Sequence, residues 1–187
     1  MAISQKRKLT LEEFLALPDQ KPALEYEDGR VTQKVSPQGK HSVLQFTVAD
    51  RFNRFAVPRK LGMAFPELRT TYAGYSRVPD VAVYRWERIP VDESGKVANA
   101  FREPPDIAIE IVSPEQRINA QVQRCLWYVE NGVVVALLLD PSDESVRLFR
   151  PNRPIAELHG ADRIPLGDIL PRFRLTVQDL FDSLFLR

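Results

Sequence analysis

The period of the hydrophobic positions changes several times along the chain, and each period predicts a different kind of element. Apolar residues alternate with others in "DVAVYRW" (80–86) and "DIAIEIV" (106–112), which is typical of strands. Between about Lys40 and Lys60 they recur at helical spacing. The nearly continuous run "VVVALLLDP" (133–141) predicts a strand covered on both faces, with "SVRLFRP" (145–151) pairing beside it. This order predicts an α/β or α+β domain with a central mixed sheet and helices on both faces.

Capping and turn signals predict where further elements begin and end. Thr10 followed by "LEEF" indicates a helix start, with Glu13 completing a capping box. "ALEYEDGRVTQKVSP" (23–37) predicts a hairpin around a Glu-Asp-Gly turn. Ser113-Pro114-Glu115-Gln116 predicts a helix that starts at Ser113 and lasts to Asn131-Gly132. "LTVQDLFDSLFLR" (175–187) predicts a final amphipathic helix capped by Thr176, and 87–104 is expected to be a loop.

The bulk composition narrows the class of protein without naming a function. A chain of 187 residues suits one domain spanning 1–187. Lys+Arg 26 against Asp+Glu 25 gives no strong overall field, so a nucleic-acid partner would need a local basic patch. The single cysteine, Cys125, excludes an internal disulfide and falls on an apolar helix face, where packing is the expected role. No signal peptide or membrane-spanning run is evident, so a cytoplasmic protein without membrane association is expected.

A glutamate inside a buried strand is the first sign of special chemistry. In "DIAIEIV" Glu110 shares a strand face with Asp106, Ala108 and Val112, while the isoleucines form the opposite, core face. A carboxylate in such surroundings must be paired, protonated or bound to a cation. The simpler alternative is an ion pair with a lysine or arginine across the sheet.

A second Pro-Asp phrase favours the other alternative, a metal site. "RVPDVAVY" (77–84) and "PPDIAIEIVSPEQR" (104–117) each place Pro-Asp directly before an alternating strand. Asp80 at the start of one strand and Glu110 within its neighbour could converge on one hard cation, with a backbone carbonyl as third ligand. Glu25, before the hairpin turn, is a candidate contributor. Asp106 lies roughly 13 Å along the strand from Glu110 and is expected to be a strand-end residue outside the site.

These motifs resemble those of a known nuclease superfamily. Pro79-Asp80, a long connection and then Glu110-Ile111-Val112 is similar to the core of PD-(D/E)XK nucleases, and more closely to the Uma-two family of restriction endonuclease-like proteins. The resemblance covers most of the chain. It also includes "LTLEEFLALP" (9–18), "LEYEDGRV" (24–31), His41 and "YVENGVVVALLLDP" (128–141).

The resemblance implies a restriction-endonuclease-like core and a metal-dependent endonuclease that hydrolyses phosphodiester bonds of DNA. Asp80, Glu110 and the carbonyl of Ile111 would bind Mg²⁺ or Mn²⁺, and the metal would activate water and stabilise the charge on the phosphate. Glu25, His41 and Tyr128 would line the cleft. A homodimer would suit duplex DNA, and the apolar end "LFDSLFLR" (180–187) is suited to an interface.

The chain departs from the family pattern at the lysine. The family supplies it from the following helix, in a pattern similar to Asp-x-x-x-Lys-x-x-x-Tyr, and the matching positions here are Ala120, Arg124 and Tyr128. The spacing of four keeps them on one helix face. Arg124 is expected to clamp a phosphate or pair with Glu110, but it does not easily lose a proton.

Two functions therefore stay open at the level of sequence. The first is an endonuclease with a damaged or retuned site. The second is a catalytically inactive nuclease-fold module that binds nucleic acid or protein. In that second case Glu110 and Arg124 form a buried ion pair and no divalent metal binds.

The remaining polar and aromatic residues have ordinary interpretations. His41 is most simply a surface or capping residue, although the resemblance also assigns it to the cleft. His159 is expected in a solvent-facing turn, and Trp127 in the core. The basic residues of the long helix are expected to form a solvated face more readily than a DNA-binding stripe; they are Arg51, Arg54, Arg59 and Lys60.

Overall fold

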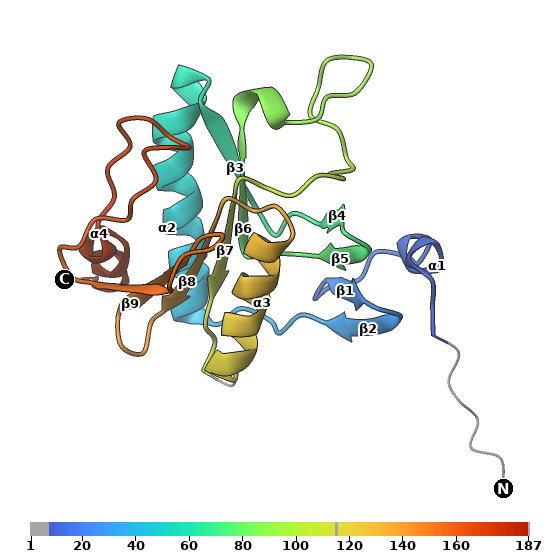
Figure 1. Cartoon of the computed structure of the whole chain (residues 1–187), viewed down its shortest axis with the longest axis horizontal. Helices are drawn as coiled ribbons and strands as arrows, with labels where there is room; N and C mark the ends of the chain where they lie inside the picture. Colours follow the sequence, from blue (N-terminus) through green and yellow to red (C-terminus); the bar gives the residue numbers. More distant parts are fainter. Residues whose placement is uncertain (1–7, 115, 187) are drawn as a thin grey trace, which may run out of the picture.

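The larger of two sheets is a six-stranded mixed sheet. The computed structural model describes residues 8–114 and 116–186. The strand order of the larger sheet is β10-β9-β8-β7-β6-β3 (Figure 1). Its strands are β3 (Gly62–Pro66), β6 (Val81–Arg85), β7 (Ile107–Ile111), β8 (Val135–Asp140), β9 (Ser145–Phe149) and β10 (Ala156–His159). The predicted central mixed sheet is confirmed.

The pairing at the centre of this sheet brings the two Pro-Asp phrases together. β7 and β8 are parallel, while β6 runs antiparallel to β7 with Val81 opposite Ile109. The start of β6 therefore lies beside the carboxyl end of β7. Since Asp80 directly precedes β6, it reaches the end of β7 where Glu110 is located.

A smaller antiparallel sheet lies beside the larger one and is joined to it by residues 78–80 (Figure 1). Its order is β2-β1-β5-β4, and α1 (Leu11–Leu15) lies at its outer side. The strands are β1 (Leu24–Glu27), β2 (Arg30–Gln33), β4 (Thr70–Tyr72) and β5 (Tyr75–Arg77). The hairpin turn has positive φ at both Asp28 (45°) and Gly29 (80°), as a tight Asp-Gly turn requires. The predicted hairpin is confirmed.

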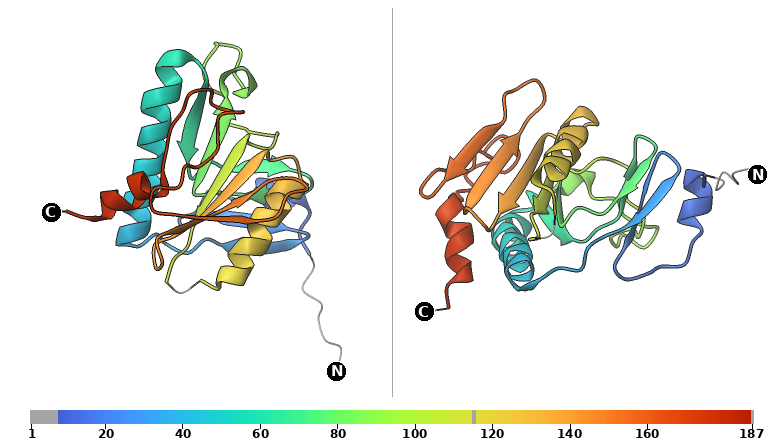
Figure 2. Two further views of the ribbon diagram at one scale, coloured as in Figure 1. Left: turned by 60° about the vertical axis from the view of Figure 1, so that its left-hand side comes forward. Right: turned by 90° about the horizontal axis from the view of Figure 1, so that it is seen from below.

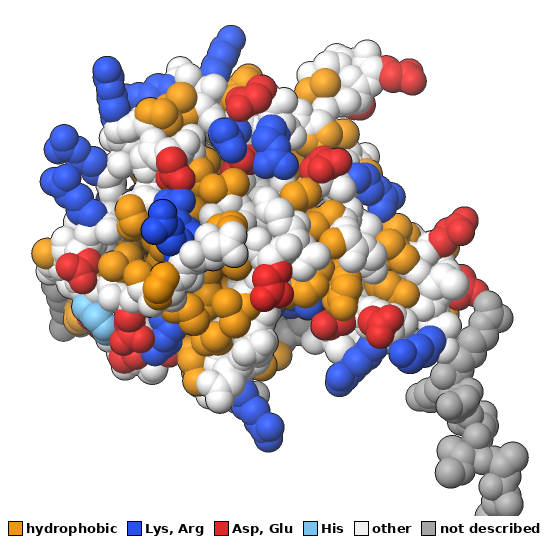
Figure 3. Space-filling model, viewed as in Figure 1, with side chains coloured by type: hydrophobic (Ala, Val, Ile, Leu, Met, Phe, Trp, Pro, Cys, Tyr) orange, Lys and Arg blue, Asp and Glu red, His pale blue; other side chains and the backbone are white. Residues whose placement is uncertain are grey.

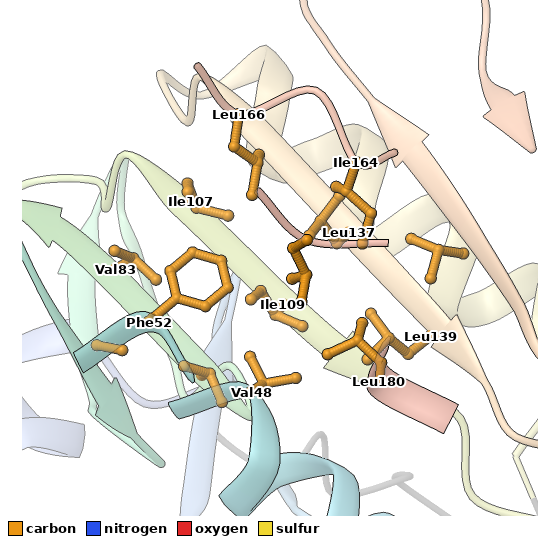
Figure 4. Packing of buried hydrophobic residues seen from close by; sticks show 14 of the residues in the cluster. Val48, Phe52, Val83, Ile107, Ile109, Leu137, Leu139, Ile164, Leu166 and Leu180 are labelled. Carbon is orange, nitrogen blue, oxygen red and sulfur yellow. The ribbon is translucent and has the colours of Figure 1, made fainter. Parts of the chain in front are cut away.

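Helices cover both faces of the larger sheet, α2 (Gly39–Ala56) on one and α3 (Ile118–Glu130) on the other (Figures 1 and 2). The three isoleucines of β7 belong to one core cluster with residues of α2, β8 and α4 (Val177–Phe181). Figure 4 shows two of them, Ile107 and Ile109, in this cluster. Ala108 and Val112 belong to the cluster that packs against α3. Glu110 therefore projects toward α3, as the alternation along β7 predicts.

Helix ends follow the sequence signals in some places and not in others. Thr10 caps α1 and Thr176 caps α4, each with a complete capping box. The predicted start of α3 at Ser113 is wrong, because α3 begins at Ile118 with Arg117 as N-cap. A turn occupies this stretch instead: the Gln116 N–H donates to the Ser113 carbonyl, and the Gln116 side chain accepts from the Ser113 N–H. Glu115 of the predicted helix start lies outside the described residues.

The other boundaries agree with expectation apart from the final helix. α3 ends at Glu130, with Gly132 at φ 101°. The long helix continues into a 3₁₀ turn (Val57–Arg59). The stretch 87–104 is a loop entered through a second 3₁₀ turn (Trp86–Arg88). α4 is shorter than predicted and passes into a 3₁₀ turn (Asp182–Leu184). Among the described residues, none of the helices has the length and apolarity to cross a membrane.

Gly62 of β3 is expected to tolerate no side chain. A Cβ at Gly62 would lie 2.5 Å from the backbone carbonyl oxygen of Tyr84, which the paired strand holds in place. Gly62→Ala should therefore lower the free energy of unfolding by about 1–3 kcal/mol, measured by urea denaturation. Gly167→Ala is the matched control, because no atom of the described residues beyond its two chain neighbours lies within 4 Å of its added Cβ. Equal stability of the two variants would contradict this reading of β3.

Candidate active site

Asp80 is bound to the end of β7 through its side chain. Its Oδ2 accepts a hydrogen bond of 2.7 Å from the backbone N–H of Ile111. β6 starts only at Val81, so the carboxylate supplies the acceptor that a paired strand would otherwise provide. The N–H and C=O of one strand residue face the same neighbour, so the Ile111 carbonyl is directed to this side as well.

Three side chains from the preceding segments surround Asp80. Lys34, directly after β2, donates from Nζ to Asp80 Oδ1 at 2.6 Å and to the Val78 carbonyl at 2.8 Å. His41 Nε2 lies 3.0 Å from Asp80 Oδ2, and the Gln45 amide donates to the Asp80 carbonyl at 2.9 Å. His41 is only 7% exposed, so its simpler interpretation as a surface residue is wrong. Lys34, after β2, and His41, on α2, thus fix the position of the carboxylate, and Gln45 fixes the backbone of the same residue.

Glu110 is held by the helix that covers its face of the sheet. Its Oε1 accepts from Arg124 Nε at 2.6 Å and from the Tyr128 hydroxyl at 2.7 Å. Arg124 and Tyr128 are one helical turn apart on α3, which lets both reach the same oxygen. Sequence spacing predicted this face of the helix.

Arg124 joins Glu110 to a third carboxylate, that of Glu25. Its two terminal nitrogens bind Glu25 in a bidentate pair, with 2.9 Å between Nη1 and Oε2. One of them also lies 3.4 Å from the carbonyl of Val78, whose N–H donates to Glu25 at 2.7 Å. With the contact to Glu110, four of the five N–H groups of Arg124 therefore have partners among residues 8–114 and 116–186. The buried ion pair between Glu110 and Arg124, one of the two sequence alternatives, is present.

The carboxyl groups of the site differ in how readily they ionise. Burial opposes ionisation of Asp80, but the Lys34 ammonium and His41 outweigh it and hold its pKa below the usual range. Burial likewise opposes ionisation of Glu25, and the charge of Arg124 lowers its pKa overall. For Glu110, burial dominates and raises the pKa. The pKa values of Asp80 and Glu25 are thus lowered, whereas that of Glu110 is raised.

All of the proposed cleft residues come together in this network, and sequence reasoning missed two of its members. Lys34 and Gln45 were not predicted, because a lysine after a polar hairpin and a glutamine on an amphipathic helix carry no distinguishing signal. Ala120 lies on the first turn of α3 and has no polar group to contribute.

Asp106 lies in a different environment, as the strand geometry predicted. It is fully buried, and its Oδ2 accepts from the Arg85 backbone N–H at 2.8 Å. Its Oδ1 lies 2.8 Å from Arg85 Nε and 2.8 Å from Arg88 Nη1. This aspartate anchors the start of β7 and forms ion pairs with Arg85 and Arg88.

The other residues singled out have the ordinary roles expected of them. Arg54 pairs with Asp50 on the exposed side of α2, and Arg51 lies 3.8 Å from Asp179. On the face in Figure 3, basic and acidic side chains both occur among hydrophobic ones. Cys125 is fully buried, and His159 is exposed. Trp127 packs against other rings, those of Tyr72, Tyr75 and Tyr128.

The oxygen atoms of Asp80, Glu110 and the Ile111 carbonyl are the type of ligand that a hard cation such as Mg²⁺ prefers. Among the described residues, no three His, Cys, Asp or Glu side chains are grouped so as to hold a metal ion. Mg²⁺ commonly needs only one or two carboxylates and keeps several waters, so Asp80, Glu110 and the Ile111 carbonyl satisfy its chemistry. Lys34 occupies Asp80 Oδ1, so a cation would have to compete with its ammonium for that oxygen.

Comparisons with known proteins place the chain among nuclease-like proteins. A family model described as Uma2, "Putative restriction endonuclease", matches residues 11–178, and the chain belongs to this family. A solved structure titled as a putative nuclease belonging to DUF820, from Anabaena variabilis ATCC 29413, is 36% identical. The match covers 95% of this chain and 99% of that chain, with a TM-score of 0.90. A search of curated proteins gave no significant match.

Proposed function

We propose that this protein is a metal-dependent endonuclease that hydrolyses phosphodiester bonds of DNA. The observation that carries the proposal is the 2.7 Å hydrogen bond from the Ile111 N–H to Asp80, which sets this carboxylate beside Glu110. Membership of the Uma2 family supports a nuclease-like activity. The metal, the DNA substrate and the roles of the residues are our proposal.

Asp80, Glu110 and the Ile111 carbonyl would hold Mg²⁺ or Mn²⁺. When bound, the metal supplies a Lewis acid that activates water and stabilises negative charge on the phosphate. Asp80 is suited to this role because His41 and the Ile111 N–H orient it, and because its low pKa keeps it ionised. Orienting contacts of this kind tune a metal ligand and limit its motion.

Arg124 contributes positive charge beside Glu110 in this scheme. The bidentate pair with Glu25 anchors its guanidinium independently of Glu110. Its remaining N–H is the donor that can meet a phosphate oxygen, the role predicted from its place in the helix pattern. Tyr128 orients the Glu110 carboxyl through Oε1.

One observation favours a second candidate function. Glu110 forms a buried ion pair with Arg124, and its raised pKa reduces its affinity for a cation. Both features suit an inactive nuclease-fold module that binds nucleic acid or protein without a metal. The family match is equally compatible with such a descendant.

A homodimer is a further part of the proposal. Cleavage of both strands of duplex DNA calls for two sites, and the end of the chain carries exposed apolar residues. Phe185 is 65% and Leu186 is 93% exposed. Exposed apolar residues are common on protein surfaces, so the test of this point is a measurement of the molecular mass in solution.

The experiment is a plasmid-nicking assay with Mg²⁺ or Mn²⁺, run beside the same assay in EDTA. The purified protein is expected to nick plasmid only with metal, and Asp80→Ala and Glu110→Ala are expected to remove the activity. Circular dichroism of the two variants checks that they fold. Metal-dependent nicking no greater than that of the folded variants would favour the inactive module.

A further inference from the structure

Lys34 is a second cation beside the proposed metal ligands, and unlike Arg124 it contacts Asp80. Its ammonium donates to Asp80 Oδ1 at 2.6 Å and to the Val78 carbonyl at 2.8 Å. The side chain is 13% exposed, and that of Asp80 only 4%. It extends from the segment between β2 and α2, outside the helix that carries lysine in the family pattern.

Within the described residues, the Lys34 ammonium and the Arg124 guanidinium each retain one N–H group without a partner. A lysine has three N–H groups, and within the described part of the chain two of them are used, by Asp80 and Val78. Arg124 has committed four of five to Glu25, Glu110 and Val78. The third donor of Lys34 is therefore available to an anion that enters beside Asp80.

We propose that Lys34 takes the place of the missing helix lysine and competes with the divalent cation for Asp80. Without metal, its ammonium neutralises Asp80 through Oδ1. With Asp80 holding a divalent cation, the ammonium would be released from Oδ1 and would be free to bind a phosphate oxygen. The inference rests on the proposed nuclease function, and it assigns a second positive charge at the phosphate, in addition to Arg124, to a residue between β2 and α2.

The position of Lys34 beside Asp80 provides the site with a lysine although α3 carries arginine at position 124. The ammonium is a compact charge on a flexible stem, so it can shift by a few ångströms, whereas Arg124 is fixed by its bidentate pair. If Lys34 had only a structural role, its substitution would also free Asp80 for a cation. It would not, however, be needed once metal is bound, and this difference makes the two roles separable.

The test compares Lys34→Met with Lys40→Met, an exposed lysine on the first turn of α2 that contacts none of the site residues described above. Mn²⁺ affinity is measured by calorimetry, and single-turnover nicking is measured at saturating Mn²⁺. Lys34→Met is expected to bind Mn²⁺ about tenfold more tightly than the unmodified protein, because a competing positive charge is gone. It is expected to nick about a hundredfold more slowly. Lys34→Arg should recover part of the rate.

Tighter binding together with slower nicking supports the proposal. Nicking by Lys34→Met as fast as by Lys40→Met overturns it, and so does Mn²⁺ affinity that is unchanged or weaker in a folded Lys34→Met protein. Failure of the proposed nuclease function can be distinguished from failure of the Lys34 proposal, because in that case the unmodified protein itself shows no metal-dependent nicking. That result would overturn the role of Lys34 along with it.

Discussion

Asp80→Asn is expected to slow metal-dependent DNA nicking by at least about a thousandfold, which corresponds to about 4 kcal/mol of transition-state stabilisation. The substitution preserves the size of the side chain and removes its charge. A neutral amide is a poor ligand for Mg²⁺. The other proposed carboxylate ligand, Glu110, has a raised pKa and compensates poorly for the lost charge. The remaining oxygen also cannot accept from Ile111, His41 and Lys34 together, as the two carboxylate oxygens do.

Asp106→Asn is the matched control, because it makes the same chemical change in the other Pro-Asp phrase. Asp106 is fully buried and bound by Arg85 and Arg88, away from Glu110. Removing one partner of a buried ion pair costs about 3 kcal/mol of stability. The rate per folded molecule, in contrast, should stay within about threefold of the unmodified protein, since no proposed ligand is touched.

The two variants are compared by single-turnover nicking, with the folded fraction taken from circular dichroism and urea denaturation. The expected pattern is a large loss of rate for Asp80→Asn and a loss of stability for Asp106→Asn. Equal losses of rate per folded molecule would remove the distinction between the two phrases. A fully active Asp80→Asn protein would exclude Asp80 as a metal ligand.

The sequence predicted the elements well wherever a local periodic signal was strong. Burial of one face or both gives each element a periodic pattern of apolar residues that can be recognised from the local sequence. This holds for the alternation along β7, the apolar run of β8 and the helical spacing of α2. The start of α3 was wrong although Ser113 and Pro114 satisfy the rules for a helix start. There the same polar groups close a turn, and local rules do not distinguish these outcomes.

The candidate site was partly visible for an energetic reason. A carboxylate in a buried strand needs a partner, so Glu110 could be singled out before any contact was known. Its pairing with Arg124 was one of two roles expected for that arginine, whose position came from the family resemblance. The contact of Asp80 with Ile111 depends on how β6 and β7 pair, and that register is not encoded locally. Lys34 could not be predicted as a site residue because lysines are common after polar hairpins. Only the tertiary fold brings it to Asp80.

Arg124→Met is expected to lower the free energy of unfolding by about 3–5 kcal/mol near neutral pH. The guanidinium pairs with Glu25 and Glu110, whose side chains are 11% and 5% exposed, so its loss leaves two buried carboxyls without their cation. Arg124→Lys should cost less, because it keeps the charge while losing the bidentate geometry. Urea denaturation followed by tryptophan fluorescence measures both variants.

The pH dependence of this loss identifies its electrostatic origin. Arg124 holds the pKa of Glu25 below its usual range, so its stabilising effect is present above that range and is lost as the pH falls through it. In Arg124→Met the unpaired carboxyl is protonated more easily, so the stability gap to the unmodified protein should narrow between pH about 7.5 and pH about 5. Adding Glu25→Gln to Arg124→Met should recover part of the loss at the higher pH. A gap that stays constant over this range would assign the loss to packing of the arginine side chain, since a change in hydrophobic contacts does not depend on proton binding.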